Sequence, residues 1–201
     1  MTQRSAELQS FLDSLQSGFA TSERPPEVAA VAETLFCALA RPAPPIAPAP
    51  ARLPVCDCLP AALAIAGTTS PALAAAFAAI EPQLRWAVRA SGGRFASANW
   101  PEGHANATIV GPEHGLEGRR DVAIGVSLLA PHVRYPDHSH APEEIYLLLT
   151  PGRFRHGVSD WFEPGAGGTL HNIPDITHAM ASQAAPLLAI WCLLLTPRAL
   201  H

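Results

Sequence analysis

The chain has 201 residues, of which 48% are hydrophobic and only 15% are charged, with 13 basic and 17 acidic side chains. This length suits one domain, or one domain with an appendage, and the apolar content is enough for a single substantial core. The mild net charge of −4 argues against nucleic-acid binding and against attraction to anionic membranes.

Membrane and secretion features are also missing from the sequence. No apolar run approaches the roughly 20 residues needed to span a bilayer, and the N-terminal segment lacks an apolar signal core. We therefore expect a cytoplasmic protein without membrane contacts. The four cysteines are scattered, and Cys56 and Cys58 lie too close together for a common zinc pair, so all four are expected to be ordinary reduced thiols.

The first part of the chain is predicted to be helical. Apolar residues recur at helical spacing over 8–19 and again over 28–36, where a Pro-Pro pair opens the stripe. A third helical block follows Ser70, and Pro82 should break it. Between the second and third blocks, RPAPPIAPAPARLP (41–54) contains six prolines and predicts an extended connector.

From about Arg94 the pattern changes to short strands. Runs rich in β-branched, aromatic and leucine residues alternate with Gly and Pro clusters, and they read RFASANW, NATIVG, DVAIGVSLLA, EIYLLLT, GTLHNIP and LLAIWCLLL. Many short strands at this spacing predict an antiparallel sandwich or barrel. We therefore divide the chain into a helical extension, residues 1–93, and a β-barrel catalytic domain, residues 94–201.

The stretch YPDHSHAPEEIY, residues 135–146, concentrates both tyrosines of the chain with two histidines and two carboxylates. Residues two apart on a strand point to the same side, so His138 would project with His140, and Glu144 with Tyr146. The intervening APE suits a turn. If the two strands pair as a hairpin, two imidazoles and one carboxylate converge on the barrel interior.

This set of side chains suits a divalent transition metal such as zinc, iron, manganese, cobalt or nickel. His178, near the start of a later strand, is well placed to be a further ligand. Because a buried structural zinc more often uses cysteines, mixed histidine and carboxylate ligands favour an open site that a substrate can reach.

These residues also resemble a known family. HSHAPEE, a His-x-His-x3-Glu pattern, resembles the first cupin motif, and IPDITH resembles the second, which supplies the last histidine. YPDHSHAPEEIYLLLTPG and WFEPGAGGTLHNIPDITHAM are similar to the cupin-type dimethylsulfoniopropionate (DMSP) lyases, the DddQ kind in particular, most densely over 121–195. The resemblance implies a mainly β cupin barrel (a double-stranded β-helix or jelly roll) with an N-terminal α-helical extension, and the metal ligands His138, His140, Glu144 and His178.

The resemblance further implies a metal-dependent carbon–sulfur lyase that cleaves DMSP to acrylate and dimethyl sulfide by β-elimination. Tyr146, on the same strand face as Glu144, is the expected base for the α-proton, and Tyr135 a substrate-binding or metal-adjacent residue; the reverse assignment stays open. Aromatic faces attract sulfonium-like cations, so Trp161 and Trp191 are candidates for the wall that receives the dimethylsulfonium group.

Other functions fit the same ligand set, because a fold does not determine a function. An iron cupin dioxygenase would require ferrous iron and consume oxygen, and a cupin isomerase is a further alternative. A cupin that only binds a small metabolite would need no base and would leave the paired tyrosines unexplained. The identity of the metal stays open, and a homodimer is one possible assembly.

Overall fold

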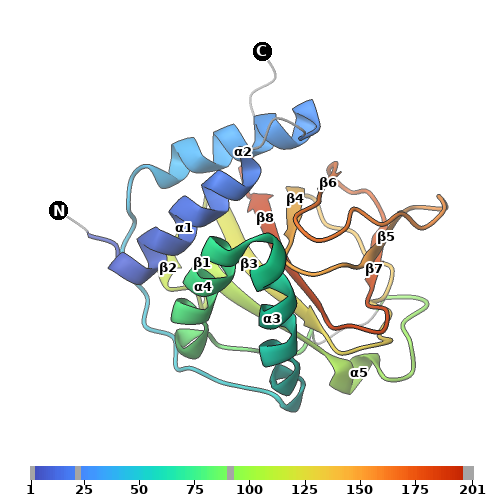
Figure 1. Cartoon of the computed structure of the whole chain (residues 1–201). Helices are drawn as coiled ribbons and strands as arrows, with labels where there is room; N and C mark the ends of the chain where they lie inside the picture. Colours follow the sequence, from blue (N-terminus) through green and yellow to red (C-terminus); the bar gives the residue numbers. More distant parts are fainter. Residues whose placement is uncertain (1–2, 21–23, 90–92, 197–201) are drawn as a thin grey trace.

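The computed structural model describes residues 3–20, 24–89 and 93–196, which form a helical layer and two β-sheets (Figure 1). The helical elements are α1 (Ala6–Phe19), α2 (Pro26–Leu39), the 3-10 helix η1 (Pro54–Cys58), α3 (Leu59–Thr69), α4 (Pro71–Ile80), the 3-10 helix η2 (Glu81–Gln83) and α5 (Trp100–Gly103). The strands are β1 (His104–Gly111), β2 (Glu117–Gly118), β3 (Val122–Leu129), β4 (Glu143–Leu148), β5 (Arg153–His156), β6 (Thr169–Asn172), β7 (His178–Ala181) and β8 (Leu187–Leu194). Within the described residues, no helix is both long and apolar enough to cross a membrane.

The predicted helices form where their apolar stripes lie. In α1, the buried residues are the stripe itself, and the hydroxyl of Ser5 caps the helix by accepting a hydrogen bond from the backbone N–H of Leu8. Helix α4 begins at Pro71 and ends at Ile80, where the chain tightens into η2 around Pro82. The sequence did not predict α3.

The proline-rich connector is extended, as predicted. Between α2 and η1 the chain forms only isolated bridges, one from Pro45 to Glu117 and one from Ala51 to Arg85. The connector therefore runs along the edge of the fold and returns the chain to the helical layer.

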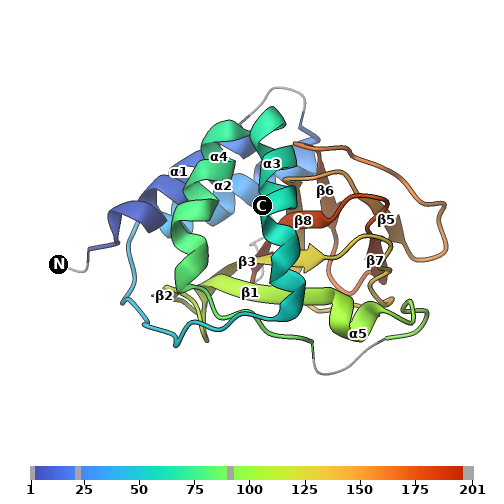
Figure 2. The same ribbon diagram turned by 60° about the horizontal axis from the view of Figure 1, so that its bottom comes forward.

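The large sheet has six strands in the order β2-β1-β3-β8-β4-β6, and a small sheet pairs β5 with β7. Strands β3 and β8 are antiparallel over their whole length, from Val122 opposite Leu194 to Leu129 opposite Leu187. Helices cover one side of the large sheet (Figure 2), and a second apolar cluster lies against its other side. Because both faces are covered, every residue of β3 is buried, and all of its side chains except that of Ser127 are apolar.

Alternation along the strands separates two hydrophobic clusters. On β4, Ile145 and Leu147 belong to the cluster shared with helices α1 to α4, whereas Tyr146 and Leu148 face the interior between the two sheets. Because helices and strands share the first cluster, they form one packed structure. The predicted division into a helical extension and a barrel domain, between residues 93 and 94, therefore stays a proposal, and it describes the order in which helices and strands follow along the chain.

Two expectations about strands are wrong. Of the run 94–100, only Arg94 makes a bridge, to Asp137, and the segment then turns into α5. The hairpin expected within 138–146 also does not form, since β4 pairs with β6 and β8. His138 instead bridges His178, a partner 40 positions away along the chain, so the long-range pairing replaces the local turn.

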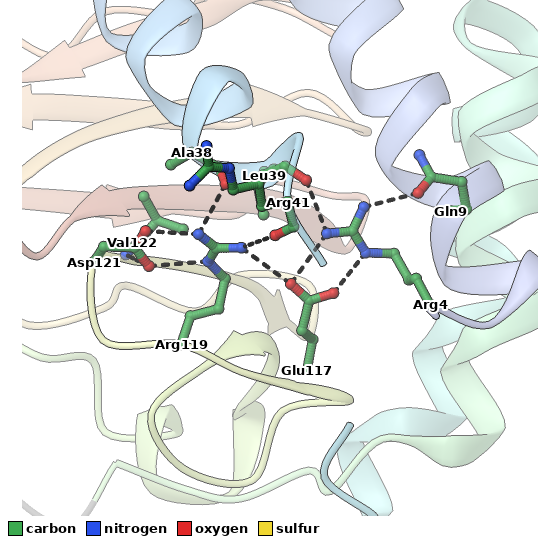
Figure 3. A network of polar contacts seen from close by, with 9 residues as sticks. All are labelled: Arg4, Gln9, Ala38, Leu39, Arg41, Glu117, Arg119, Asp121 and Val122. Carbon is green, nitrogen blue, oxygen red and sulfur yellow. Dashed lines mark hydrogen bonds and ion pairs between the residues drawn. The ribbon is translucent and has the colours of Figure 1, made fainter. Parts of the chain in front are cut away.

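A buried ionic network ties the first helix to the sheet (Figure 3). The guanidinium of Arg4 makes two hydrogen bonds to the carboxylate of Glu117, of 2.6 and 3.0 Å, and Arg119 reaches the same carboxylate at 3.3 Å. Burial opposes the charge of Glu117, but the hydrogen bonds and charge of Arg4, together with hydrogen bonds from the Ala43 backbone and Arg119, outweigh burial and lower the pKa of Glu117. Arg4 and Arg119 also donate to the carbonyls of Leu39 and Ala38 at the end of α2, so the network fixes α1 and α2 at the edge of the sheet.

Candidate metal centre and cavity

A cavity of about 370 Å³ opens between the two sheets, a size typical of small-molecule sites. It is lined by charged, polar and apolar side chains from β1, β3, β4, β7, β8 and the flanking loops. They are Arg85, Ala87, Val88, Arg89, Asn106, Thr108, His114, Ser127, Tyr135, His138, His140, Glu144, Tyr146, Met180, Trp191 and Leu193.

The segment before the first motif reaches the cavity by running antiparallel to β7. Tyr135 donates its backbone N–H to the carbonyl of Met180, and the backbones of His138 and His178 exchange hydrogen bonds of 3.0 and 2.8 Å. This pairing places the imidazoles of His138 and His178 side by side, with ring centroids 4.2 Å apart. The two cupin-like motifs therefore meet through backbone pairing.

Three of the four predicted ligands gather around one point. The candidate ligand atoms of His140, Glu144 and His178 all lie within 4.8 Å of one another. Oε2 of Glu144 is 3.2 Å from Nε2 of His140 and 3.5 Å from Nε2 of His178. His138 lies beside this group but outside it, with its ring 6.3 Å from that of His140.

The three histidines of the motifs are all held through Nδ1, which leaves Nε2 facing away from the backbone. Nδ1 of His138, His140 and His178 lies 2.9, 2.9 and 3.0 Å from the backbone carbonyls of Pro136, Pro142 and Ile176. A carbonyl only accepts hydrogen bonds, so each Nδ1 carries the proton and each Nε2 of a neutral ring keeps its lone pair. Metal-binding histidines are held in this way.

The electrostatics of the rings support the same conclusion. Burial lowers the pKa of both His138 and His178 to about 4, so both imidazoles are neutral near pH 7. At His140, burial opposes protonation, but the hydrogen bond and charge of Glu144 outweigh it and raise the pKa. Nε2 of His178 is buried without a hydrogen-bond partner among the described residues, an orphaned acceptor that a metal ion would satisfy.

Glu144 is oriented by a residue that the sequence analysis missed. Asn172, opposite Glu144 in the pairing of β4 with β6, is fully buried and donates from Nδ2 to Oε2 of Glu144 at 2.7 Å. His156 lies 2.7 Å from the other end of the Asn172 amide. This support fixes the carboxylate in the cavity, as the outer partners of metal ligands do.

The two tyrosines face the same cavity from different elements. Tyr146 is buried, and its hydroxyl contacts the carboxylate of Glu144. Burial and the negative charge of Glu144 raise its pKa well above 10. Tyr135 is also buried, and its hydroxyl oxygen accepts a 3.2 Å hydrogen bond from the Asn106 amide.

Of the two predicted wall residues, Trp191 lines the cavity. It lies opposite Tyr146 on β4 and opposite Gly125 on β3. A Cβ atom at Gly125 would lie 2.0 Å from the Trp191 ring, so only glycine allows the indole this close to the strand. Trp161 is not among the residues that line this cavity, and its ring lies under the guanidinium groups of Arg134, Arg153 and Arg155, so its role as a wall residue stays a prediction.

The family can now be assigned. A model of the dimethylsulfoniopropionate lyase family matches residues 27–189 of this chain. The chain belongs to this family. The match runs from α2 to β8, so it includes the helical layer apart from α1 as well as the barrel, and it confirms the prediction of a carbon–sulfur lyase that acts on DMSP.

Solved structures of DMSP lyases have the same fold. The crystal structure of the DMSP lyase DddQ from Ruegeria pomeroyi DSS-3 is similar with a TM-score of 0.70 and 23% sequence identity, covering 95% of this chain and 92% of that one. A structure described with the DMSP lyases RdDddP and RnDddQII gives a TM-score of 0.68 and 21% identity, over 94% and 92% of the two chains. The cupin barrel with helices is therefore confirmed. No curated protein matches the chain.

Two arginines that line the cavity of this DMSP lyase family member were also not predicted from the sequence. Arg85 and Arg89 follow the helical layer and line the cavity from the segment that leads into the barrel. The charge of Arg89 acts on His138, His140 and Tyr146, and in each case it favours the deprotonated form. No motif marks these arginines, because only the fold brings residues 85–89 to the strands.

The low pKa of two buried imidazoles predicts a pH-dependent stability for the metal-free protein. Unfolded histidines take up protons below about pH 6.5, whereas folded His138 and His178 do so only near pH 4. The unfolded state thus binds more protons between these values, and stability falls as the pH decreases through this window. We expect a loss of about 1 to 3 kcal/mol from pH 7.5 to pH 5, since the raised pKa of His140 opposes part of it.

Urea unfolding of metal-free protein at the two pH values measures this loss. A His178→Asn variant should show a smaller difference, because one of the two imidazoles is gone. Equal or greater stability at pH 5 for the unmodified chain would contradict the neutral, buried state of these rings.

Proposed function

We propose that His140, Glu144 and His178 hold one divalent transition metal, with His138 as a further ligand, and that Tyr146 removes the α-proton of DMSP. The convergence of Nε2 of His140, Nε2 of His178 and the Glu144 carboxylate, beside a buried tyrosine, is the observation that carries the proposal. The donor set fits zinc, iron, manganese, cobalt or nickel.

The proposed reaction is a β-elimination. Tyr146 takes the proton from the carbon next to the carboxylate, and the electron pair of that C–H bond forms the new C=C bond. The C–S bond breaks with its electron pair remaining on sulfur, so a cationic sulfonium leaves as neutral dimethyl sulfide. Acrylate remains, and the proton on Tyr146 returns to solvent. The leaving group therefore needs no acid.

A metal held at these ligands would act as a Lewis acid toward the substrate carboxylate and stabilise the negative charge that develops when the α-proton leaves. The buried Tyr146 is poorly suited to be a base while the charge of Glu144 is uncompensated, because that charge and burial raise its pKa. Tyr146 therefore becomes a base only when a cation offsets Glu144. The proposal thus makes activity depend on the metal through a residue of this chain.

The cavity also suits the two ends of the substrate. Arg89 places a positive charge in the cavity, which attracts a carboxylate and repels a sulfonium. Trp191 offers an aromatic face for the sulfonium, worth roughly 0.5 to 2 kcal/mol. Tyr135, which also lines the cavity, is proposed to bind the substrate.

Headspace gas analysis with DMSP tests this proposal. We expect metal-free protein to release no dimethyl sulfide above the uncatalysed background, and protein loaded with at least one of the five metals to release dimethyl sulfide and acrylate in equal amounts. No dimethyl sulfide with any of these metals would refute the proposal, and oxygen consumption in place of elimination would favour a cupin dioxygenase.

A further inference from the structure

Two polar residues of the cavity have no part in the chemistry above. Asn106 on β1 and Ser127 on β3 lie directly opposite each other in the strand pairing, and both side chains line the cavity. Ser127 is only 2% exposed and is the one polar side chain in the strand VAIGVSLL. Buried polar groups keep hydrogen-bond partners, so the partners of this pair are informative.

Ser127, Asn106 and Tyr135 form a directed chain of hydrogen bonds. Oγ of Ser127 donates to Oδ1 of Asn106 at 2.6 Å, and Nδ2 of Asn106 donates to the hydroxyl oxygen of Tyr135 at 3.2 Å. In this orientation the amide of Asn106 turns its carbonyl oxygen to Ser127 and its NH2 group to Tyr135. Asn106 therefore presents a donor to Tyr135.

The ring of Tyr135 is held as firmly as its hydroxyl. Trp100 and His104 contact the ring edge-on, with centroids 5.8 and 5.5 Å away, and Tyr135 is 3% exposed. Since the amide of Asn106 occupies a lone pair of the phenolic oxygen, the O–H hydrogen is free to point to another acceptor. Tyr135 lines the cavity with Tyr146, so a group bound in the cavity can serve as that acceptor.

We propose that Ser127 and Asn106 are positioning residues that make Tyr135 a hydrogen-bond donor to the carboxylate of the substrate. This inference rests on the proposed function, because it requires a carboxylate in this cavity. The opposite amide orientation would make Tyr135 donate to Asn106 and turn its lone pairs to the substrate, as a base requires. The direction of these hydrogen bonds thus assigns different roles to the two tyrosines. Tyr135 donates a hydrogen bond to the substrate, and Tyr146 accepts the α-proton.

Binding of propionate to the metal-loaded enzyme, measured by calorimetry, tests this inference. A hydrogen bond to a charged group contributes about 10- to 100-fold in affinity, so Tyr135→Phe should lower the affinity for propionate by that factor. Asn106→Leu should weaken it by about tenfold and Ser127→Ala by about threefold, since both act by orienting the same bond. Affinity for trimethylsulfonium, which has no carboxylate, should be unchanged in all three variants.

A double-mutant cycle separates positioning from a merely structural role. In the Tyr135→Phe background, Asn106→Leu and Ser127→Ala should each change propionate affinity by less than about twofold, because their only route to the ligand is gone. With DMSP, the single variants should raise KM while kcat changes by less than about threefold. If Asn106→Leu does not fold, Ser127→Ala carries the cycle alone, and metal content confirms an intact centre.

Two results would overturn the inference. One is that Asn106→Leu or Ser127→Ala lowers propionate affinity by the same factor whether or not Tyr135 keeps its hydroxyl. The other is a collapse of kcat in Tyr135→Phe at unchanged propionate affinity, which would make Tyr135 the base. If the unmodified enzyme releases no dimethyl sulfide, but the effects of Asn106→Leu and Ser127→Ala on propionate binding still depend on the Tyr135 hydroxyl, the positioning role stands and the proposed function fails.

Discussion

Replacing His178 with alanine is expected to abolish both metal binding and DMSP cleavage. His178 is 6% exposed, and its Nε2 is buried without a partner, 3.5 Å from the Glu144 carboxylate. Without this ligand, two side chains remain in the cluster of three, and the metal occupancy measured by mass spectrometry should fall from near one to near zero. Loss of a Lewis acid worth several kcal/mol should lower turnover by about 1000-fold or more.

His171→Ala is the matched control for this variant. Nε2 of His171, on β6, lies 2.8 Å from Oε1 of Glu143, and His171 does not belong to the cluster of His140, Glu144 and His178, so its loss should leave metal content and turnover close to normal. The corresponding His138→Ala variant shows whether His138, the predicted ligand outside the cluster of three, contributes. Undiminished metal in His178→Ala would contradict the ligand assignment.

Tyr146→Phe is expected to retain metal and substrate affinity while losing turnover. The change removes only the hydroxyl that contacts Glu144, and the ring still fills its place in the interior cluster. Removal of a general base typically costs about 100- to 10,000-fold in rate, so kcat should fall within that range. Steady-state release of dimethyl sulfide, together with propionate binding, separates the loss of chemistry from a loss of binding.

Tyr135→Phe completes this comparison, because the chain has only these two tyrosines. The proposal requires opposite patterns: a loss of kcat for Tyr146→Phe, and a loss of affinity for Tyr135→Phe. Near-normal kcat in Tyr146→Phe would transfer the role of base to Tyr135.

Much of the candidate metal centre could be predicted from the sequence because the proposed ligands come in local motifs. His140 and Glu144 belong to one short stretch, and His178 begins a strand in a second stretch, so their types and spacing carry the information. Their mutual arrangement could not be predicted, since the bridge from His138 to His178 depends on a long-range pairing that replaces the expected hairpin.

The residues around the centre were missed for a related reason. Asn172, Asn106 and Ser127 act through the register between strands, and no single segment displays that register. Trp161 was assigned to the cavity on its residue type alone. The guanidinium groups that cover it come from positions 134, 153 and 155, which meet only in the fold.

The helical layer shows where periodicity succeeds and where it fails. Helix α1 displays large buried residues at regular spacing, so its stripe is evident. Helix α3 buries Leu59, Ala62 and Ala66, and two of these three are alanines, which are too small to define an apolar stripe. Strand β5, RFRH, was missed because three of its four residues are polar or charged.

Anomalous diffraction from crystals of the full chain grown with one of the five metals tests the central claim most directly. With data collected at the absorption edge of that metal, we expect one strong peak in the anomalous difference map. The peak should lie within bonding distance of Nε2 of His140, Nε2 of His178 and a carboxylate oxygen of Glu144. A peak elsewhere, or a cavity in which these three side chains point apart while metal binds at another place, would contradict the proposed chemistry.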